Sequence, residues 1–319
     1  MKRVISCAVS AVLFCMLPVG ARAAEHLIPV GKIIGLQLRS GSVTVVAYDE
    51  NLGADARAAG LKIGDEILTI DHQTVTCAED VRTALDSCGG QVRLTVRRDG
   101  GEKQLCLPAR QTQDGPRLGV YLRQGIAGIG TVTFFDPETG TFGTLGHGVC
   151  DGRGKLLEMT GGTAFDAVVA NVKKGRSGDP GQLKGSAGNE IGTLLRNTPR
   201  GVFGISERGW TGEALPVADY GELRCGSACI RSTVNGEEPR EYSVEILKIY
   251  PEERSDGRNF LIRVTDPGLL EATGGIVQGM SGSPIIQDGK LIGAVTHVLV
   301  NDPQRGYGIF IENMLEAAQ

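Results

Sequence analysis

The larger, C-terminal part of the chain, from about residue 117 to 319, consists of short apolar segments separated by glycine-rich turns. Typical segments are "AFDAVVANVKKG", "EYSVEILKIYP", "NFLIRVTDP" and "KLIGAVTHVLV". Helical periodicity is scarce there, except near the C-terminal "IENMLEAA". Many short strands with regularly spaced turns favour a β-barrel or a β-sandwich. The 47 glycines and the aromatic content of only 5% also agree better with strands and turns than with a helical bundle.

The N-terminus has the pattern of a targeting segment. Lys2 and Arg3 precede an apolar run that extends from Val4 to Val19, and the small-x-small sequence "ARA" follows at 21–23. This order predicts a signal peptide over residues 1–23 and an exported protein. The alternative is an uncleaved anchor that associates with the membrane. The run is short for a transmembrane helix and is interrupted by Pro18.

Charge and cysteine content narrow the function classes. A formal net charge of −4 argues against a nucleic-acid-binding protein, which would usually carry a basic face. Beyond the targeting segment, six cysteines could form disulfides in an exported protein, but the sequence does not determine their pairing. The sequence "CGSAC" at 225–229 allows a loop disulfide or half of a metal site, although no second pair of ligands with matching spacing accompanies it. The six are Cys77, Cys88, Cys106, Cys150, Cys225 and Cys229.

Residues 33–108 form one unit of strands and short helices. "IIGLQLRSGSVTVVAY" predicts a strand pair, "CAEDVRTALDSC" a helix, and the sequence around Asp99-Gly100 a hairpin. The stretch "AGLKIGDEILTIDHQTV" resembles the PDZ family, with Asp71-His72 where that family often has Asn-Gly. We therefore expect a small α+β PDZ domain at 33–108, followed by a linker and a second domain at 117–319.

The PDZ resemblance implies a peptide-binding loop. Backbone amides around Ile34, Gly35 and Leu36 would receive the terminal carboxylate of a peptide that adds to the sheet as a strand. The alternative is that this edge docks onto the rest of the protein.

The stretch "VQGMSGSPII" at 277–286 has the composition of a nucleophile turn, although ordinary turns use the same residue types. Ser281 would need a base, since a serine hydroxyl is a poor nucleophile at neutral pH. His147, between two glycines in "TLGHGVCD", is the best of the four histidines. His26 lies beside the cleavage site, and His72 lies in the PDZ turn. His297 lies in a strand, where a core or edge role is the better interpretation.

An imidazole base needs an acceptor on its other nitrogen, usually a carboxylate. Asp266 ends an apolar strand fifteen residues before Ser281. The order His147, Asp266, Ser281 is that of chymotrypsin-like proteases, and "GMSGSP" looks like their nucleophile turn. The N–H groups of Gly279 and Ser281 would then form the oxyanion hole. Ser283 is the rival nucleophile, and we expect it to point away from Ser281. On spacing alone the other acids stay open: Asp136, Asp151, Asp166 and Asp179.

The chain closely resembles the SpoIVB (stage IV sporulation protein B) peptidase family of endospore-forming bacteria. The resemblance rests on "AGIGTVTF", "TLGHGV", "RNTPRGVFG" and the block from "TDPGLLEATGGIVQGMSGSPII" to "GYGIFIENML", with a PDZ domain before the protease. Carried over by motif, the triad of the family falls on His147, Asp266 and Ser281. The resemblance implies a mainly β protein, in which a chymotrypsin-like β-barrel serine peptidase domain follows the PDZ domain.

The resemblance also implies a biological role. Members are exported from the forespore into the space between the two sporulation membranes. There they cleave a membrane-anchored inhibitor of an intramembrane protease, which triggers activation of the late mother-cell sigma factor. They also cleave themselves, with the PDZ domain governing self-recognition. No metal or organic cofactor is implied. The competing hypotheses are a non-catalytic PDZ scaffold and a quality-control protease with broad specificity.

Overall fold

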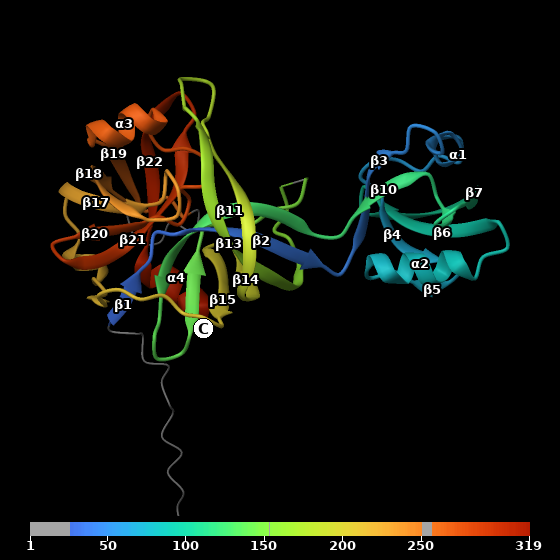
Figure 1. Cartoon of the computed structure of the whole chain (residues 1–319), viewed down its shortest axis with the longest axis horizontal. Coiled ribbons are helices and arrows are strands. Elements are labelled where there is room, and N and C mark those ends of the chain that lie inside the picture. Colours follow the sequence, from blue (N-terminus) through green and yellow to red (C-terminus); the bar gives the residue numbers. More distant parts are fainter. Residues whose placement is uncertain (1–25, 153, 251–256) are drawn as a thin grey trace, which may run out of the picture.

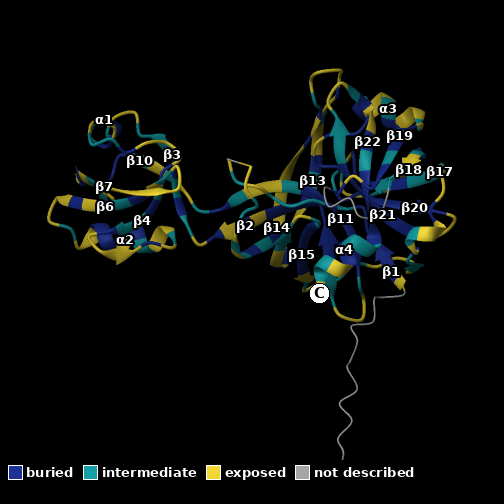
Figure 2. Ribbon diagram, turned by 180° about the vertical axis from the view of Figure 1, so that it is seen from behind, coloured by how far each residue is buried: buried dark blue, intermediate teal, exposed yellow. Residues whose placement is uncertain are grey.

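A computed structural model describes residues 26–152, 154–250 and 257–319, so the predicted segment 1–23 lies outside the described residues. Figure 1 shows two bodies: a larger one that contains two barrels, and a smaller one that contains a sheet and helices. Two neighbouring segments of chain connect them. In Figure 2 the buried residues gather inside each body, which indicates that each has its own core.

The first barrel is closed by a pairing between strands that are close in sequence. The hydrogen-bonded order is β12-β15-β14-β13-β2-β11-β1-β16, and the further pairing of β12 with β11 closes a ring of six strands, from β11 through β12, β15, β14, β13 and β2. The strands of this sheet are β1 (His26–Pro29), β2 (Ile33–Ser40), β11 (Ile126–Phe135), β12 (Thr141–Thr144), β13 (Met159–Lys173), β14 (Gln182–Thr198), β15 (Gly201–Ser206) and β16 (Leu215–Pro216).

The second barrel is a closed ring with the order β17-β18-β19-β22-β21-β20. Buried and partly buried residues alternate along β19 ("FLIRV"), so that one face of this strand fills the barrel, whereas β20 is buried along its whole length. Phe260 and Phe310 lie inside it with ring centroids 5.5 Å apart. Its strands are β17 (Gly226–Ser232), β18 (Arg240–Ile249), β19 (Phe260–Val264), β20 (Pro284–Gln287), β21 (Lys290–Leu299) and β22 (Asp302–Phe310).

Three short helical segments accompany the barrels: η1 (Tyr220–Glu222), α3 (Pro267–Thr273) and α4 (Ile311–Ala318). The apolar face of α4 packs in one cluster with Phe134 and Phe203 of the first barrel and Leu291 of the second. This shared cluster joins the two barrels through apolar burial. No helix in the described part of the chain is long and apolar enough to span a bilayer.

The smaller body is a sheet of order β10-β3-β4-β6-β7, with β5 paired to β4 and a short β8–β9 hairpin beside it. The predicted helix is α2, whose Val81, Ala84 and Leu85 are buried against the sheet. The predicted hairpin turn has Asp99 and Gly100 at φ 51° and 79°, which suits a tight β-hairpin. The elements are β3 (Val43–Tyr48), α1 (Gly53–Ala58), β4 (Glu66–Ile70), β5 (Gln73–Thr74), α2 (Ala78–Asp86), β6 (Gln91–Arg98), β7 (Gly101–Pro108), β8 (Arg110–Thr112), β9 (Gly115–Arg117) and β10 (Val120–Arg123).

The chain passes between the two bodies twice, which the predicted boundaries of 33–108 and 117–319 do not describe. Strand β2 lies in the first barrel between β11 and β13, although it precedes the smaller body in sequence. Strand β10, predicted as part of the peptidase domain, forms the edge of the smaller sheet beside β3. The predicted strand pair at 33–48 is therefore two strands in different sheets. The alternating pattern is satisfied by either partner, so the pattern alone does not select one.

Candidate active site

The turn that contains Ser281 is held by buried threonines of β11. The hydroxyl of Thr131 donates to the carbonyl of Gly279 at 2.8 Å, and the hydroxyl of Thr133 donates to the carbonyl of Gly282 at 2.7 Å. The N–H of Thr131 also donates to the carbonyl of Ser281 at 2.9 Å. Both threonines are fully buried. The first barrel therefore fixes the position of a turn that belongs to the second.

Gly282 is required by the close approach of these two segments. Its φ is +94°, in the left-handed region that favours glycine. A Cβ at this position would lie 2.0 Å from the carbonyl oxygen of Thr131 and 2.5 Å from the nitrogen of Leu145. Only a residue without a side chain lets the serine turn contact the strand that holds it.

A left-handed turn presents His147 directly after β12. Leu145 and Gly146 have φ values of +69° and +67°, which is unusual for a buried leucine. The Nδ1 atom of His147 lies 3.0 Å from the carbonyl oxygen of Gly148. Since a carbonyl only accepts, we assign the proton to Nδ1, which leaves Nε2 as the basic nitrogen.

The surroundings of His147 favour its neutral form. Burial lowers the pKa of the imidazole below its ordinary value of 6.5, and the hydrogen bond to Gly148 opposes that shift. The charged ring loses more hydration than the neutral ring when water is excluded, which explains the direction. His147 is therefore able to accept a proton at neutral pH.

One pocket brings the predicted nucleophile, base and oxyanion residues together. A cavity of about 320 Å³ is lined by His147, Gly279 and Ser281. Leu36, Leu38, Ile126, Ile129 and Leu145 supply its apolar walls. In this structure the hydroxyl of Ser281 donates to the carbonyl of Thr296 at 2.8 Å, so attack on a substrate requires rotation of the serine side chain.

The predicted oxyanion donors lie on the rim of this pocket. Among the hydrogen bonds of the described residues, none uses the N–H group of Gly279 or of Ser281. The neighbouring amides are occupied, since Gly282 N–H donates to Val295 and Ser283 N–H donates to Met280. Two unused amides beside a serine suit a developing negative charge on a carbonyl oxygen.

Asp266 does not contact His147 in this structure. Its carboxylate caps helix α3 by accepting from the N–H of Leu269 at 2.8 Å, and Pro267 follows at the first helical position. The acceptor at His147 Nδ1 is the carbonyl of Gly148 instead. In this structure Asp266 therefore does not orient the imidazole of His147. Its place in the triad stays a prediction from the family resemblance.

The other acids considered from spacing are engaged elsewhere. Asp136 accepts from Glu138 N–H and from the Thr139 hydroxyl in the β11–β12 turn. Asp166 pairs with Arg208, Asp179 pairs with Lys173, and Asp151 accepts from Lys155 N–H.

His297, for which the sequence favoured a core or edge role, lies beside the candidate base. Its ring packs against His147 with centroids 5.2 Å apart and planes inclined by 40°. The sequence gives no signal for this contact. The β20–β21 pairing has an irregularity between Ile285 and Ile286 that cannot be read from the sequence, and the residue that meets the Ser281 hydroxyl is Thr296.

Ser283 is not placed to compete with Ser281. It is fully buried, and its hydroxyl donates to the hydroxyl of Ser232 at 2.9 Å, away from the pocket. The expectation that the two serines point in different directions is confirmed.

The predicted peptide-binding loop at Ile34, Gly35 and Leu36 is a barrel strand. These residues pair with β11 on one side and β13 on the other, and Ile34 and Leu36 are buried. A strand with neighbours on both sides has no free edge for a peptide, so this prediction is wrong.

The smaller sheet offers a different edge beside α2. Among the strands that the structure describes, β10 pairs with β3 alone, and the side-chain oxygen of Gln124, which follows it, accepts from Ala78 N–H at the start of α2. The preceding Gly119 has a φ of +71°. In the described hydrogen bonds, the N–H groups of Leu118 and Gly119 are not used. Unused amides at such a turn form a small anion-binding concavity.

All six described cysteines are free thiols. Burial raises the pKa of the Cys229 thiol to about 11, so this thiol is protonated and unreactive at neutral pH. Within the described ranges, no group of three or more His, Cys, Asp or Glu residues is arranged to hold a metal ion.

Comparison with known families agrees with this geometry. The model of the family described as SpoIVB peptidase S55 matches residues 114–315, and that of the PDZ domain matches residues 33–108. The chain belongs to the SpoIVB peptidase S55 family. The predicted family and domain order are confirmed, and the protein is a serine peptidase with a PDZ domain before it. Most of the PDZ match, from residue 43 onward, lies in the smaller body.

Two further similarities were found. A protein of Agrobacterium fabrum named "Putative zinc metalloprotease Atu1380" is 30% identical over 124 residues, which are 38% of this chain and 32% of that protein. Two structures of an inactive form of Rv3671c from M. tuberculosis cover 60% of this chain and 82% of theirs. Their identities are 16% and 15%, with TM-scores of 0.35 and 0.34. The description of the larger body as two closed barrels rests on the strand order of this chain, not on its similarity to these two structures.

Proposed function

We propose that this S55 family member is an exported regulatory serine endopeptidase in which Ser281 is the nucleophile and His147 is the base. The observation that carries the proposal is the shared pocket of Ser281, His147 and the unused N–H groups of Gly279 and Ser281. The apolar walls of the pocket suit an apolar substrate side chain next to the scissile bond.

The reaction follows from the positions of these groups. Ser281 Oγ turns away from Thr296, transfers its proton to Nε2 of His147 and attacks the scissile carbonyl carbon. The resulting oxyanion accepts hydrogen bonds from Gly279 and Ser281, each worth about 3 kcal/mol of barrier. His147 then donates the proton to the leaving amine, and water repeats the sequence on the acyl-enzyme. The family resemblance assigns the third triad position to Asp266, whereas the geometry gives the orienting contact at Nδ1 to the Gly148 carbonyl. The two assignments predict different turnover for Asp266→Asn.

The substrates are inferred from the family. The enzyme would cleave its own N-terminal region and a membrane-anchored inhibitor of an intramembrane protease, which would trigger late mother-cell sigma factor activation. Residues 1–23 would direct export to the space between the forespore and mother-cell membranes, and would hold the chain at the membrane if they are not removed. The edge of β10 beside α2 would bind the peptide segment that the PDZ domain recognises.

The test is incubation of the purified full chain, as wild type and as Ser281→Ala, followed by intact mass measurement. Trimming of the N-terminal region with time in the wild type alone supports the proposal. Ser283→Ala is the matched control and should trim like the wild type. Trimming in both the wild type and Ser281→Ala would exclude Ser281 as the nucleophile. If the wild type cleaves neither itself nor an added inhibitor ectodomain, the non-catalytic scaffold becomes the better hypothesis.

A further inference from the structure

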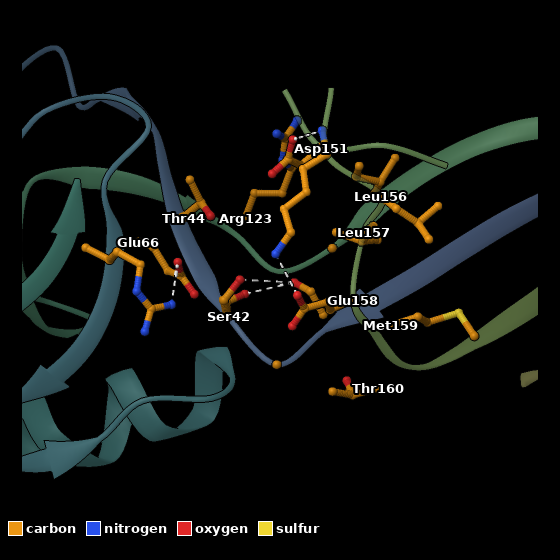
Figure 3. Close-up of a pocket in the computed structure, with 16 residues that line it drawn as sticks. Ser42, Thr44, Glu66, Arg123, Asp151, Leu156, Leu157, Glu158, Met159 and Thr160 are labelled. Atoms are coloured by element: carbon orange, nitrogen blue, oxygen red, sulfur yellow. Dashed lines mark hydrogen bonds and ion pairs between the residues drawn. The ribbon is translucent and has the colours of Figure 1, made fainter. Parts of the chain in front are cut away.

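A second pocket lies between the two bodies and is larger than the pocket around Ser281. We term it the interdomain pocket, and the pocket around Ser281 the active-site pocket. The volume of the interdomain pocket is about 420 Å³, and Figure 3 shows side chains from both bodies around it. Thr44 and Glu66 come from the smaller body, whereas Leu157 and Glu158 come from the segment that follows His147. In contrast to the apolar site around Ser281, its lining includes six charged side chains: Glu66, Arg97, Arg123, Asp151, Lys155 and Glu158.

The two pockets form one groove because the same two strands, β2 and β11, line both of them. On β2, Leu36 and Leu38 line the active-site pocket, and Ser40 and Ser42 further along the chain line the interdomain pocket. On the antiparallel β11, Ile126 lines both pockets. Beyond the last paired residues of β2 and β11, the side-chain amide of Gln124 donates to the carbonyl of Ser40 at 3.3 Å and keeps the two segments side by side.

The two pockets also share a wall. Residues 147–150 line the active-site pocket, and residues 151 and 155–160 line the interdomain pocket. A chain that leaves the active site along β2 and β11 therefore runs directly into the space between the bodies. This continuity argues against an isolated surface hollow.

The length of the groove defines which substrate residue reaches the interdomain pocket. The catalytic end is at Ile129, whose Cδ1 would lie 3.1 Å from a Cβ on Gly279. Arg123 is six residues earlier in the chain. At about 3.3 Å per extended residue, the distance along the groove is at most roughly 20 Å, since the left-handed Gly125 interrupts the extended backbone between β10 and β11. An extended substrate would place its sixth residue from the scissile bond, within about one position, beside Arg123.

The charges in the interdomain pocket favour an acidic partner for Arg123. Arg97 pairs with Glu66 at 3.1 Å, and Lys155 pairs with Glu158 at 2.7 Å. Asp151 is engaged with the N–H of Lys155. Arg123 is exposed, and no ion pair within the described ranges includes it. Glu66 and Glu158 are already paired with Arg97 and Lys155, and an exposed guanidinium such as that of Arg123 matches a carboxylate.

We propose that the interdomain pocket is a distal substrate subsite, in which Arg123 binds the side-chain carboxylate of an Asp or Glu about six residues from the scissile bond. The inference rests on the proposed peptidase function and deepens it, since it gives the PDZ-containing body a direct part in sequence selection. Cleavage at few sites follows, because both an apolar residue at the cut and a distant acid are required.

The test is cleavage of a peptide library prepared from a proteome with a lysine-specific protease, which leaves acidic residues inside the peptides. Wild type, Arg123→Gln and Arg123→Glu are compared, with Ser281→Ala as the blank. In the wild type we expect an excess of Asp and Glu of about two- to fivefold at a position five to seven residues from the cut, the range that one exposed ion pair supplies. Arg123→Gln should lose the excess, and Arg123→Glu should replace it with an excess of Arg, the basic residue that the library keeps inside its peptides. Arg196→Gln, an exposed arginine on β14 outside both pockets, should match the wild type.

A matched pair of peptides separates binding from chemistry. In the best-cleaved sequence, replacing the distal Glu by Gln should raise KM about two- to fivefold with kcat unchanged, and the difference should shrink in 0.5 M NaCl. Arg123→Gln should not distinguish the two peptides. A wild type that cleaves well without any acidic excess at that distance would overturn the subsite alone, as would an excess that survives in Arg123→Gln. If the wild type cleaves nothing above the Ser281→Ala blank, the proposed peptidase function fails and the subsite with it.

Discussion

The hydroxyl of Thr131 donates to the carbonyl of Gly279 at 2.8 Å, so that a strand of the first barrel holds one residue of the proposed oxyanion hole, which lies in the turn before β20. This bond is fully buried and joins residues 148 positions apart in the chain. The catalytic geometry therefore depends on the packing of the two barrels as well as on the local sequence around Ser281.

Replacement of this threonine is the first prediction. Thr131→Val leaves the Gly279 carbonyl buried without its donor and should destabilise the protein by about 1–3 kcal/mol. Because the turn is then free to shift, kcat/KM should also fall roughly ten- to a hundredfold. Thr233→Val is the control, since Thr233 is equally buried but bonds to Gly31. Denaturant unfolding should give similar losses for both variants, and peptide cleavage should fall only for Thr131→Val.

Two left-handed glycines allow a sharper test of the serine turn. Gly282→Ala should destabilise the chain by more than about 3 kcal/mol and abolish turnover, since it adds a 2.0 Å clash to an unfavourable φ. Gly289 has a φ of +76° and open space around its Cα, so Gly289→Ala should cost only about 1 kcal/mol and retain activity. Equal effects of the two variants on the melting temperature and on activity would contradict the proposed contact with Thr131.

The pH dependence follows from the lowered pKa of His147. The neutral ring is the base, so the acid limb of kcat/KM should lie below the ordinary histidine value of 6.5. The lowered pKa also makes the free energy of unfolding depend on pH, and in the same direction: it decreases as the pH falls. The unfolded chain takes up this proton first as the pH falls, so the contribution of His147 is present above 6.5 and is lost as the pH falls below it. A pH profile with its acid limb above 6.5 would show that the ring is not desolvated.

Replacing His297 should act through the environment of His147. His297→Ala opens space beside the base and admits water, so the acid limb should move upward toward 6.5 and kcat should fall. His297→Phe keeps a ring of similar size at the 5.2 Å contact and should keep the limb near its wild-type position. If both variants lose all turnover with unchanged circular dichroism, a ring nitrogen of His297 takes part directly and the packing account is wrong.

Asp266 can be tested with two substitutions that differ only in charge and capping. Asparagine caps helices as well as aspartate, whereas alanine does not. From the contact with Leu269, we expect Asp266→Ala to cost about 1 kcal/mol of stability and Asp266→Asn almost none. Asp266→Asn should retain turnover within a few fold, because the Gly148 carbonyl holds the His147 tautomer. Turnover of Asp266→Asn as low as that of Ser281→Ala would restore the triad that the family resemblance implies.

The sequence alone determined the local features of this protein. Alternating apolar positions indicated strands, the spacing of Val81, Ala84 and Leu85 indicated α2, and the composition of "VQGMSGSPII" indicated a turn of the kind that holds a nucleophile. These features depend on residues near one another in the chain. Local propensity and turn chemistry are sufficient to predict them.

The tertiary structure decided which of these features meet. It placed β2 in the barrel and β10 in the smaller sheet, set His297 against His147, and used Asp266 as a helix cap. A period of two defines which face of a strand is buried, but not which strand lies beside it. Pairing between distant segments depends on the combined burial and hydrogen bonding of whole sheets. For that reason candidates for the base and the nucleophile could be proposed from the sequence, whereas the residues that contact them could not.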